Sequence, residues 1–571
     1  MNKVIQIILF SVLVSCHTPK NTLSSHSIDP YQYTTSKKVV AQKGAVVSAH
    51  PLASKIGVAI MKKGGNAIDA AIATQLALAV VYPNAGNIGG GGFLVARLAN
   101  GQTLALDYRE IAPASAHRDM YLDAQGNVMQ GKSVNGHLSS GVPGTVAGLF
   151  ESMQYAKLPF AQLIQPAIEL AEKGFVITER EAASLNSIQK ELATYNTTTS
   201  AFQKKEKWQG GDTLIQTDLA NTLKRIKDDG AKGFYEGKTA QLVVEEMKRG
   251  GGVITMDDLK NYKAKWRTPH SFTYKGYAIV SMPMPSSGGV LLHQMLKMLE
   301  DKPLSSYGFL SPQAVQLMTE VERRAYADRA EYMGDADFYK VPVEKITSEA
   351  YLKNRMKNYD ADAAGNSQQI KPGVLPMKES EQTTHLSVID AEGNAVSVTT
   401  TLNNSYGSKT VVGGAGFFLN DEMDDFSAKP GVPNIYGAVG GEANAIAPGK
   451  RMLSSMTPTI VLQNNRPFLV VGTPGGTTIP TSVFQTIIDI IDFDMSTEDA
   501  VYKPKFHHQW LPDQLDVEKT FPQATRTALE KMGYKIKERG SIGRTEVIKV
   551  LPDGRFEAVA DNRGDDGAEG W

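Results

Sequence analysis

The sequence predicts an α+β fold in which helices pack on antiparallel sheets. Three observations lead to this prediction. Strand patterns occur near both ends of the globular region, a helix-rich region over roughly residues 145–370 lies between them, and a hydrophobic content of 42% allows a large core. At 571 residues the chain is long enough for two domains or for one large layered domain.

The first 16 residues have the pattern of an export signal. Lys3 precedes an apolar stretch from Val4 to Val14, which is too short to span a bilayer and has the length of a signal peptide. The chain then reads Ser15-Cys16, and Leu-Val-Ser-Cys resembles a bacterial lipobox. We therefore expect Cys16 to be lipidated and the protein to be an exported lipoprotein of the periplasm or cell envelope, and the alternative is a buried thiol. Cys16 is the only cysteine, so an internal disulfide is excluded.

The region after this signal divides into a polar segment and the start of the fold. Residues 17–45 are rich in serine and threonine, which predicts a disordered tether. The globular part begins at Val46 with two predicted helices, 52–65 and 66–83, which end at a Gly-Gly pair and at a proline.

A glycine-rich loop follows the second helix. Residues 84–92 contain too many glycines for a helix or a central strand, so a loop is predicted there. It leads into two short strands, 93–98 and 103–108, which form a predicted hairpin around residues 99–101.

A second predicted hairpin begins at two adjacent threonines. Its strands, 384–390 and 394–402, flank a three-residue loop that ends in glycine. If Asp390 pairs with Asn394, Thr383 lies opposite Thr401, although the register could slip by one residue. The hydroxyl of Thr401 would then lie beside that of Thr383 and could orient it.

A threonine hydroxyl is a weak nucleophile and needs a base. The free α-amine of an N-terminal threonine, with a pKa of about 8, can accept and return a proton, whereas an amide nitrogen cannot. Catalysis by Thr383 therefore requires a cut directly before it. The alternative is that Thr383 and Thr384 are ordinary strand residues, since threonine favours strands.

Six motifs in a fixed order resemble those of the γ-glutamyltranspeptidases (glutathione hydrolases). They are DYREIAPA (107–114), QTTHLSV (382–388), TLNNSYG (401–407), LNDEMDDFSAKPGVPN (419–434), LSSMTPT (453–459) and GTPGG (472–476). The resemblance extends from about residue 46 to 571. It implies the four-layer αββα sandwich of the N-terminal nucleophile hydrolases. It also implies self-cleavage between Gln382 and Thr383 into a large subunit, 46–382, and a small subunit, 383–571, that form a heterodimer, with Thr383 as the nucleophile.

The resemblance also assigns residues that recognise a γ-glutamyl group, which carries an α-carboxylate and an α-ammonium. Arg109 would bind the carboxylate with its planar fork, while Glu422, Asp425 and Asn403 would receive the ammonium. The alternatives are a surface arginine at a strand end and a solvated acidic turn, and for Asp424 we expect the solvated turn.

Three further motifs complete the implied site. Ser454 and Ser455 would hold the substrate carboxylate and neighbouring groups, although two small residues at a tight crossing are the alternative. Gly475 and Gly476 suit an oxyanion hole because backbone N–H groups can approach closely, although most such sequences are turns. Tyr436, in a Gly/Pro-rich segment over 430–445, matches the residue of a mobile lid that shields the pocket and favours small γ-glutamyl compounds.

Several other classes of function are excluded or unsupported. Equal numbers of acidic and basic residues, 60 each, remove the electrostatic argument for nucleic acid or an anionic membrane surface, so only the lipid anchor would bring the chain to a membrane. Residues 89–92 lack the Gly-Lys-Ser/Thr of a phosphate loop, and the two adjacent histidines of 506–508 suit packing better than a metal. No metal or organic cofactor is expected.

We therefore expect a γ-glutamyltransferase and glutathione hydrolase. It would cleave the γ-glutamyl amide of glutathione and related compounds through a γ-glutamyl ester and transfer the acyl group to water, amino acids or dipeptides. One alternative is an acylase on the same scaffold, acting on cephalosporins, glutaryl amides or poly-γ-glutamate. The other is a non-catalytic envelope lipoprotein, which would remain uncut.

Overall fold

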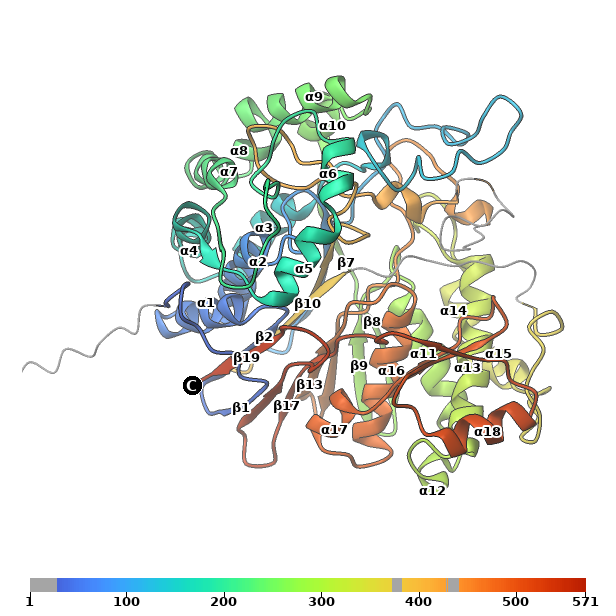
Figure 1. Cartoon of the computed structure of the whole chain (residues 1–571). Coiled ribbons are helices and arrows are strands. Elements are labelled where there is room, and N and C mark those ends of the chain that lie inside the picture. Colours follow the sequence, from blue (N-terminus) through green and yellow to red (C-terminus); the bar gives the residue numbers. More distant parts are fainter. Residues whose placement is uncertain (1–27, 372–382, 428, 430–440) are drawn as a thin grey trace, which may run out of the picture.

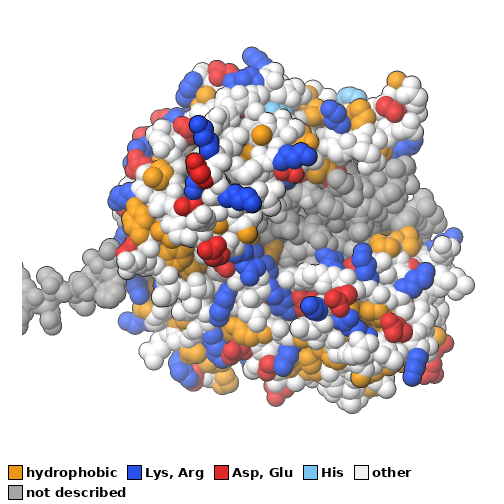
Figure 2. Space-filling model, in the orientation of Figure 1, with side chains coloured by type: hydrophobic (Ala, Val, Ile, Leu, Met, Phe, Trp, Pro, Cys, Tyr) orange, Lys and Arg blue, Asp and Glu red, His pale blue; other side chains and the backbone are white. Residues whose placement is uncertain are grey.

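The computed structural model describes residues 28–371, 383–427, 429 and 441–571. Three residues with predicted roles, Cys16, Gln382 and Tyr436, lie outside these ranges. Within them, no helix is both long enough and apolar enough to cross a membrane. Charged side chains of both signs are scattered over the face seen in Figure 2, in keeping with the balanced composition.

Two seven-stranded antiparallel sheets form the centre of the described chain (Figure 1). The first sheet has the order β19 (Gly567–Gly570), β2 (Gly44–Ser48), β10 (Thr384–Asp390), β11 (Ala395–Thr401), β3 (Gly91–Arg97), β4 (Thr103–Asp107), β7 (Lys265–Arg267). The second has the order β1 (Lys38–Ala41), β18 (Phe556–Val559), β17 (Glu546–Val550), β13 (Arg466–Gly472), β12 (Thr459–Gln463), β9 (Tyr277–Ser281), β8 (His270–Tyr274). There are also two small sheets in the described chain. One contains β14 (Phe506–His507), β15 (Leu515–Glu518) and β16 (Ile536–Arg539), and the other contains β5 (Phe175–Val176) and β6 (Thr213–Leu214). The predicted α+β class is confirmed.

Helices lie to either side of the pair of sheets in Figure 1. Near the first sheet are α1 (Pro51–Lys62), α2 (Ala67–Val81) and α4 (Phe160–Lys173), and near the second are α11 (Gly288–Leu299), α13 (Pro312–Tyr332) and α16 (Thr478–Ile491). The remaining helices are α3 (Thr145–Ser152), α5 (Glu179–Ser187), α6 (Gln189–Tyr195), α7 (Thr217–Asp229), α8 (Lys232–Tyr235), α9 (Gly237–Gly250), α10 (Met256–Asn261), α12 (Leu304–Tyr307), α14 (Val343–Ile346), α15 (Glu349–Arg355), α17 (Thr497–Tyr502) and α18 (Gln523–Lys531).

The buried apolar side chains form three large clusters. One joins α1, α2 and α4 to the first sheet, and another joins α11, α13 and α16 to the second. The third lies between the sheets, where Val47 and Val95 of the first meet Val280 and Val470 of the second. Each sheet is therefore apolar on both faces, which explains why strands such as β10 and β11 are buried along their whole length.

The two helices predicted at the start of the fold are confirmed as α1 and α2. A capping box begins α2, because the Asn66 side chain accepts from the Asp69 N–H while the Asp69 carboxylate accepts from the Asn66 N–H. The hairpin of β3 and β4 is also confirmed, with Arg97 opposite Thr103.

The predicted register of the hairpin that starts at the threonines is confirmed. Thr384 pairs with Thr400, Ile389 pairs with Ala395, and the Asp390 N–H donates to the Asn394 carbonyl over 3.1 Å. Gly393 ends the loop with a φ of 84°, the left-handed conformation that this loop needs.

The predicted tether is wrong for residues 28–45, which are part of the fold. They contribute β1 and the start of β2, and the Lys37 ammonium donates to the carbonyls of Asp561, Gly564 and Asp566. The Tyr33 hydroxyl also donates to the carbonyl of Val176 over 2.8 Å. Polar side chains here bind backbone carbonyls that are distant in sequence, so local composition could not reveal the packing.

The glycine-rich loop is shorter than predicted, because Gly91 and Gly92 begin β3, an interior strand between β11 and β4. A Cβ atom on Gly92 would lie 2.5 Å from the carbonyl oxygen of Thr399, and one on Gly91 would lie 2.5 Å from that of Tyr108. Neighbouring backbone therefore occupies the space of a side chain, and only glycine fits this part of the sheet.

We expect Gly92→Ala to lower the free energy of unfolding by about 1–3 kcal/mol, because the methyl group must displace backbone rather than a flexible side chain. The measurement is the denaturant midpoint at unchanged slope. Gly540→Ala is the matched control, since a Cβ atom there meets nothing within 4 Å. Equal midpoints for the two variants would contradict the close approach.

Candidate active site

The β10–β11 hairpin brings Thr383 and Thr401 to the same end of the first sheet. Thr383 directly precedes β10 and is 6% exposed, and the confirmed register places it opposite Thr401. The Thr401 hydroxyl oxygen accepts from the N–H of Asn403 over 2.7 Å. Asn403 has a φ of 74° and donates through its side-chain amide to the carbonyl of Asp421 over 3.0 Å. Three predicted site residues, Thr383, Thr401 and Asn403, are therefore held at one strand end.

His385 lies two residues after Thr383, yet its surroundings are those of a structural residue. Its ring nitrogens hydrogen-bond the hydroxyls of Thr399 and Ser387 at 2.9 and 3.1 Å, and burial lowers its pKa to about 3. Its ring is neutral and both nitrogens are occupied at working pH, so it is poorly placed to activate Thr383. A base for the Thr383 hydroxyl must come from elsewhere.

Arg109 is buried beside two of the predicted acidic residues. It follows β4, is 1% exposed, and lies 2.6 Å from Glu422 and in a close ion pair with Asp425. Its backbone is fixed as well, because its N–H donates to Asp107 and its carbonyl accepts from the Tyr262 hydroxyl over 2.7 Å. The surface-arginine alternative is therefore wrong.

The acidic run around Glu422 is a buried 3-10 helix, Glu422–Asp425, so the solvated-turn alternative is also wrong. This includes Asp424, which accepts from the Ser133 hydroxyl and whose pKa burial raises to about 7. Burial raises the pKa of Glu422 well above its usual value, although Arg109 opposes that shift. Apart from the ion pair with Arg109, neither Glu422 carboxyl oxygen has a hydrogen-bond partner in the described chain, so this group can still accept N–H donors.

Glu110 belongs to the same charged group and was not predicted. One of its carboxyl oxygens lies 3.7 Å from the Arg109 guanidinium, and burial raises the pKa of Glu110 to about 7. Neither oxygen has a hydrogen-bond partner among the described residues. Glu110 follows Arg109 in the sequence, but nothing in the spacing marks it as buried.

Ser454 and Ser455 lie next to Arg109. The Arg109 guanidinium donates to the carbonyl of Leu453 over 3.3 Å, directly before the two serines. The Ser454 N–H donates to the carbonyl of Pro285 over 2.9 Å, which fixes the backbone of the pair.

Arg329 of α13 hydrogen-bonds one of the two serines directly, and its role was also not predicted. It is 2% exposed and donates to the Ser455 hydroxyl over 3.2 Å and to the Ser287 hydroxyl over 2.9 Å. Ser287 in turn donates to the carbonyl of Ser454. A long-range contact of this kind leaves no pattern in the sequence.

Gly475 and Gly476 form the turn before α16, with φ values of 139° and 58°. The N-terminus of this helix favours negative charge, and glycine leaves the backbone N–H groups accessible. The turn is tied to the Thr383 strand, because a Cβ atom on Gly472 would lie 2.2 Å from the His385 ring. Gly472 therefore packs against β10, the strand that follows Thr383, and Gly475 and Gly476 come three and four residues later in the chain.

The histidine pair over 506–508 is engaged in packing. His507 hydrogen-bonds Thr481 and Gln509 at 2.9 Å each, and both histidines are buried. In the described ranges no group of three or more His, Cys, Asp or Glu side chains is placed to hold a metal ion.

Comparisons with known proteins agree on one family. The family model described as gamma-glutamyltranspeptidase matches residues 53–571. A glutathione hydrolase proenzyme of Escherichia coli (strain K12) is 48% identical over 528 residues, which cover 92% of this chain and 91% of that protein.

Two solved structures extend the comparison. The Helicobacter pylori gamma-glutamyltranspeptidase has a TM-score of 0.57 and 47% identity, covering 60% of this chain and 97% of that chain. A cephalosporin acylase from Bacillus halodurans has a TM-score of 0.81 and 26% identity, covering 95% of this chain and 99% of that chain. The chain belongs to the γ-glutamyltranspeptidase family.

Proposed function

We propose that this protein is a γ-glutamyltransferase and glutathione hydrolase with Thr383 as its nucleophile. The observation that carries the proposal is the buried Arg109, which is ion-paired with both Glu422 and Asp425. A chain of contacts supports a common site, because Asn403 bonds both Thr401 and Asp421, the residue directly before Glu422. A cation and acids in one pocket suit the α-carboxylate and α-ammonium of a γ-glutamyl donor. A relative 48% identical to the chain bears the name glutathione hydrolase proenzyme.

The reaction has two steps on Thr383. Its hydroxyl attacks the γ-carbonyl carbon while its α-amine takes the proton, and the N–H groups of Gly475 and Gly476 stabilise the tetrahedral oxyanion. The C–N bond then breaks and the released amine takes the proton, which leaves a γ-glutamyl ester on Thr383. Water, an amino acid or a dipeptide attacks this ester, and the threonine hydroxyl is restored. Thr401 orients the Thr383 hydroxyl throughout.

Recognition of the donor relies on charges that are already paired in the free site. The donor carboxylate binds the guanidinium of Arg109 and the hydroxyls of Ser454 and Ser455. The donor ammonium binds Glu422 and Asp425, with the Asn403 amide beside them. Because the ligand brings one charge of each sign, the net charge of the pocket does not change when it binds.

Maturation is part of the same proposal. The chain cuts itself between Gln382 and Thr383 into subunits 46–382 and 383–571, which remain together as a heterodimer. The word proenzyme in the name of the relative supports this step. The clusters on the outer side of each sheet and the one between them support a four-layer αββα sandwich. Lipidation of Cys16, export to the periplasm or cell envelope, and shielding by Tyr436 complete the proposal.

An acylase is the second candidate, favoured by the similarity to the cephalosporin acylase structure. A glutaryl group lacks the ammonium that the acidic side of this pocket would bind. Comparing γ-glutamyl-p-nitroanilide with glutaryl-p-nitroanilide tests the proposal, and we expect turnover of the first at least tenfold faster. Faster turnover of the glutaryl compound would establish the acylase instead. An uncut, inactive chain would indicate a binding lipoprotein.

We expect Thr383→Ala to remain a single chain with no hydrolase activity. The variant lacks the hydroxyl that would both cleave the chain before residue 383 and attack the donor. Thr384→Val is the matched control, since the buried Thr384 hydroxyl has no hydrogen-bond partner in the described chain. It should be cut and active. Intact mass of the denatured proteins, read with donor turnover, measures both. A cut Thr383→Ala chain would exclude Thr383 as the processing nucleophile.

Arg109→Lys should lower kcat/KM for γ-glutamyl donors about 10–100-fold, because an ammonium cannot replace the bidentate fork. Steady-state kinetics on the mature enzyme measures the loss. The control is Arg526→Lys on α18, an arginine ion-paired with Glu538, which should behave as wild type. Unchanged kinetics in Arg109→Lys would remove this residue from donor recognition.

The pH dependence of the donor KM should follow the ionisation of Glu110. Its raised pKa of about 7 means that the carboxyl is neutral below pH 7 and ionised above it, where it competes with the donor carboxylate for Arg109. The donor KM should therefore rise several-fold between pH 6 and 8. In Glu110→Gln, which is neutral throughout, KM should stay flat. The same rise in both proteins would show that Glu110 is not its cause.

A further inference from the structure

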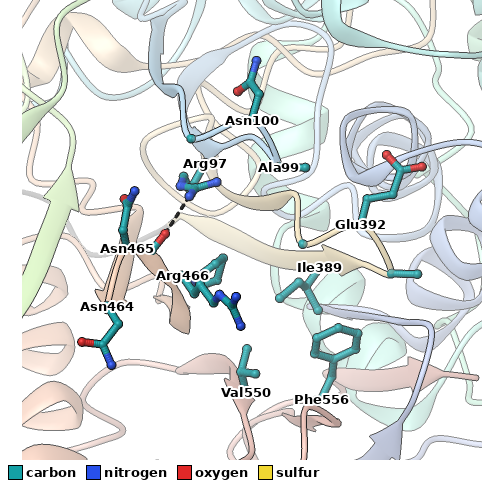
Figure 3. Close-up of a pocket in the computed structure, with 14 residues that line it drawn as sticks. Arg97, Ala99, Asn100, Ile389, Glu392, Asn464, Asn465, Arg466, Val550 and Phe556 are labelled. Atoms are coloured by element: carbon teal, nitrogen blue, oxygen red, sulfur yellow. Dashed lines mark hydrogen bonds between the residues drawn. The ribbon is translucent and has the colours of Figure 1, made fainter.

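An open pocket of about 580 Å³ lies between the sheets at the end remote from Thr383 (Figure 3). It is formed by the turns that join β3 to β4, β10 to β11 and β12 to β13, together with β17 and β18. Because β10 runs from Thr384 to Asp390, the pocket lies about 20 Å from the nucleophile along that strand. Nothing in the proposed reaction uses it.

Arg97, the last residue of β3, projects into this pocket. Side chains alternate along a strand, so Arg97 shares a face with Phe93 and Val95, which belong to the core between the sheets. Arg97 is 6% exposed and donates to the carbonyls of Asn465, over 2.6 Å, and Leu98. Figure 3 shows its guanidinium beside Asn465, with a dashed line for their hydrogen bond.

No carboxylate in the described part of the chain balances the charge of Arg97. Among the described residues it forms no ion pair, its Nε–H has no acceptor, and burial alone shifts its pKa, downwards. Other deeply buried arginines do have acidic partners, for example Arg109 with Glu422 and Arg451 with Asp107. A buried charge without a partner is costly, so its retention calls for an anion.

The rest of the pocket suits an anion with an apolar body. Arg466, at the start of β13, is exposed and forms no ion pair within the described chain, and in Figure 3 its side chain lies above Val550 and Phe556. Phe556 and Ile389 form an apolar floor. Of the described residues that line the pocket, Glu392 is the one acid, and it is already paired with Lys157.

We propose that this pocket binds a small amphipathic oxyanion, a carboxylate or phosphate monoester, with its head group on Arg97 and Arg466 and its apolar body on Phe556 and Ile389. The guanidinium fork matches both head groups. The volume of the pocket lies in the range of small-molecule sites. The inference does not depend on the proposed γ-glutamyl chemistry.

The test is calorimetric titration of the mature protein with octanoate, octyl phosphate and octanol. We expect at least one of the two anions to bind, and the tighter one identifies the head group. Octanol, which keeps the apolar body without the charge, should bind at least tenfold more weakly. Equal binding of octanol, or no binding of either anion, would overturn the proposal.

Substitutions then locate the binding. Arg466→Gln should weaken it at least fivefold, and Arg97→Lys, which keeps the charge but loses the fork, at least tenfold. Arg555→Gln is the matched control, because this exposed arginine lies in the adjacent β17–β18 turn, pairs with Asp553 and does not line the pocket. It should bind as wild type does, and so should Arg109→Lys at the distant site.

Two outcomes would count against this location. If both Arg97→Lys and Arg466→Gln bind the anion with wild-type affinity, Arg97 does not bind it. Its role would then be structural, joining the two sheets through the Asn465 carbonyl. Loss of binding in Arg109→Lys instead would place the anion in the active site. If Arg97→Lys fails to fold, the exposed Arg466 alone decides, since its replacement removes no core contact.

Discussion

The position of Thr383 depends on the register between β10 and β11. A slip of one residue would turn every side chain of β10 to the opposite face and would move Thr383 away from Thr401. The loop at the other end of the hairpin fixes that register, through the left-handed Gly393 and the pairing of Asp390 with Asn394. A short turn thus determines the position of Thr383, a full strand length away.

The site around Arg109 gathers several charged groups in a part of the core that cannot solvate them. Three buried carboxyl groups, from Glu110, Glu422 and Asp425, surround the single guanidinium of Arg109. Arg109 lowers the cost of burying them but does not remove it, and the pKa values of Glu110 and Glu422 are raised. Such a site is stable enough to fold yet retains acceptor capacity for a ligand.

Local patterns predicted the parts of the fold that depend on neighbours in sequence. The β10–β11 register followed from alternation and a three-residue loop, and the end of α2 followed from its proline. The strand within residues 38–41 was missed because its partner, Phe556–Val559, lies at the other end of the chain. Arg329 was missed in the same way, since contacts between distant segments leave no periodic signal. The roles of Arg109 and Asp425 came from resemblance, and only the structure places them together.

The order of strands in the first sheet bears on what a cut before Thr383 would produce. Strand β2 comes from before the cut, yet its two neighbours, β19 and β10, both come from after it. The second sheet also contains strands of both pieces, because β1 pairs with β18 and β9 pairs with β12. Each large sheet thus combines strands of both pieces, so neither piece has a large sheet of its own. Their dissociation would amount to unfolding, and the cut protein would behave in solution as one indivisible body.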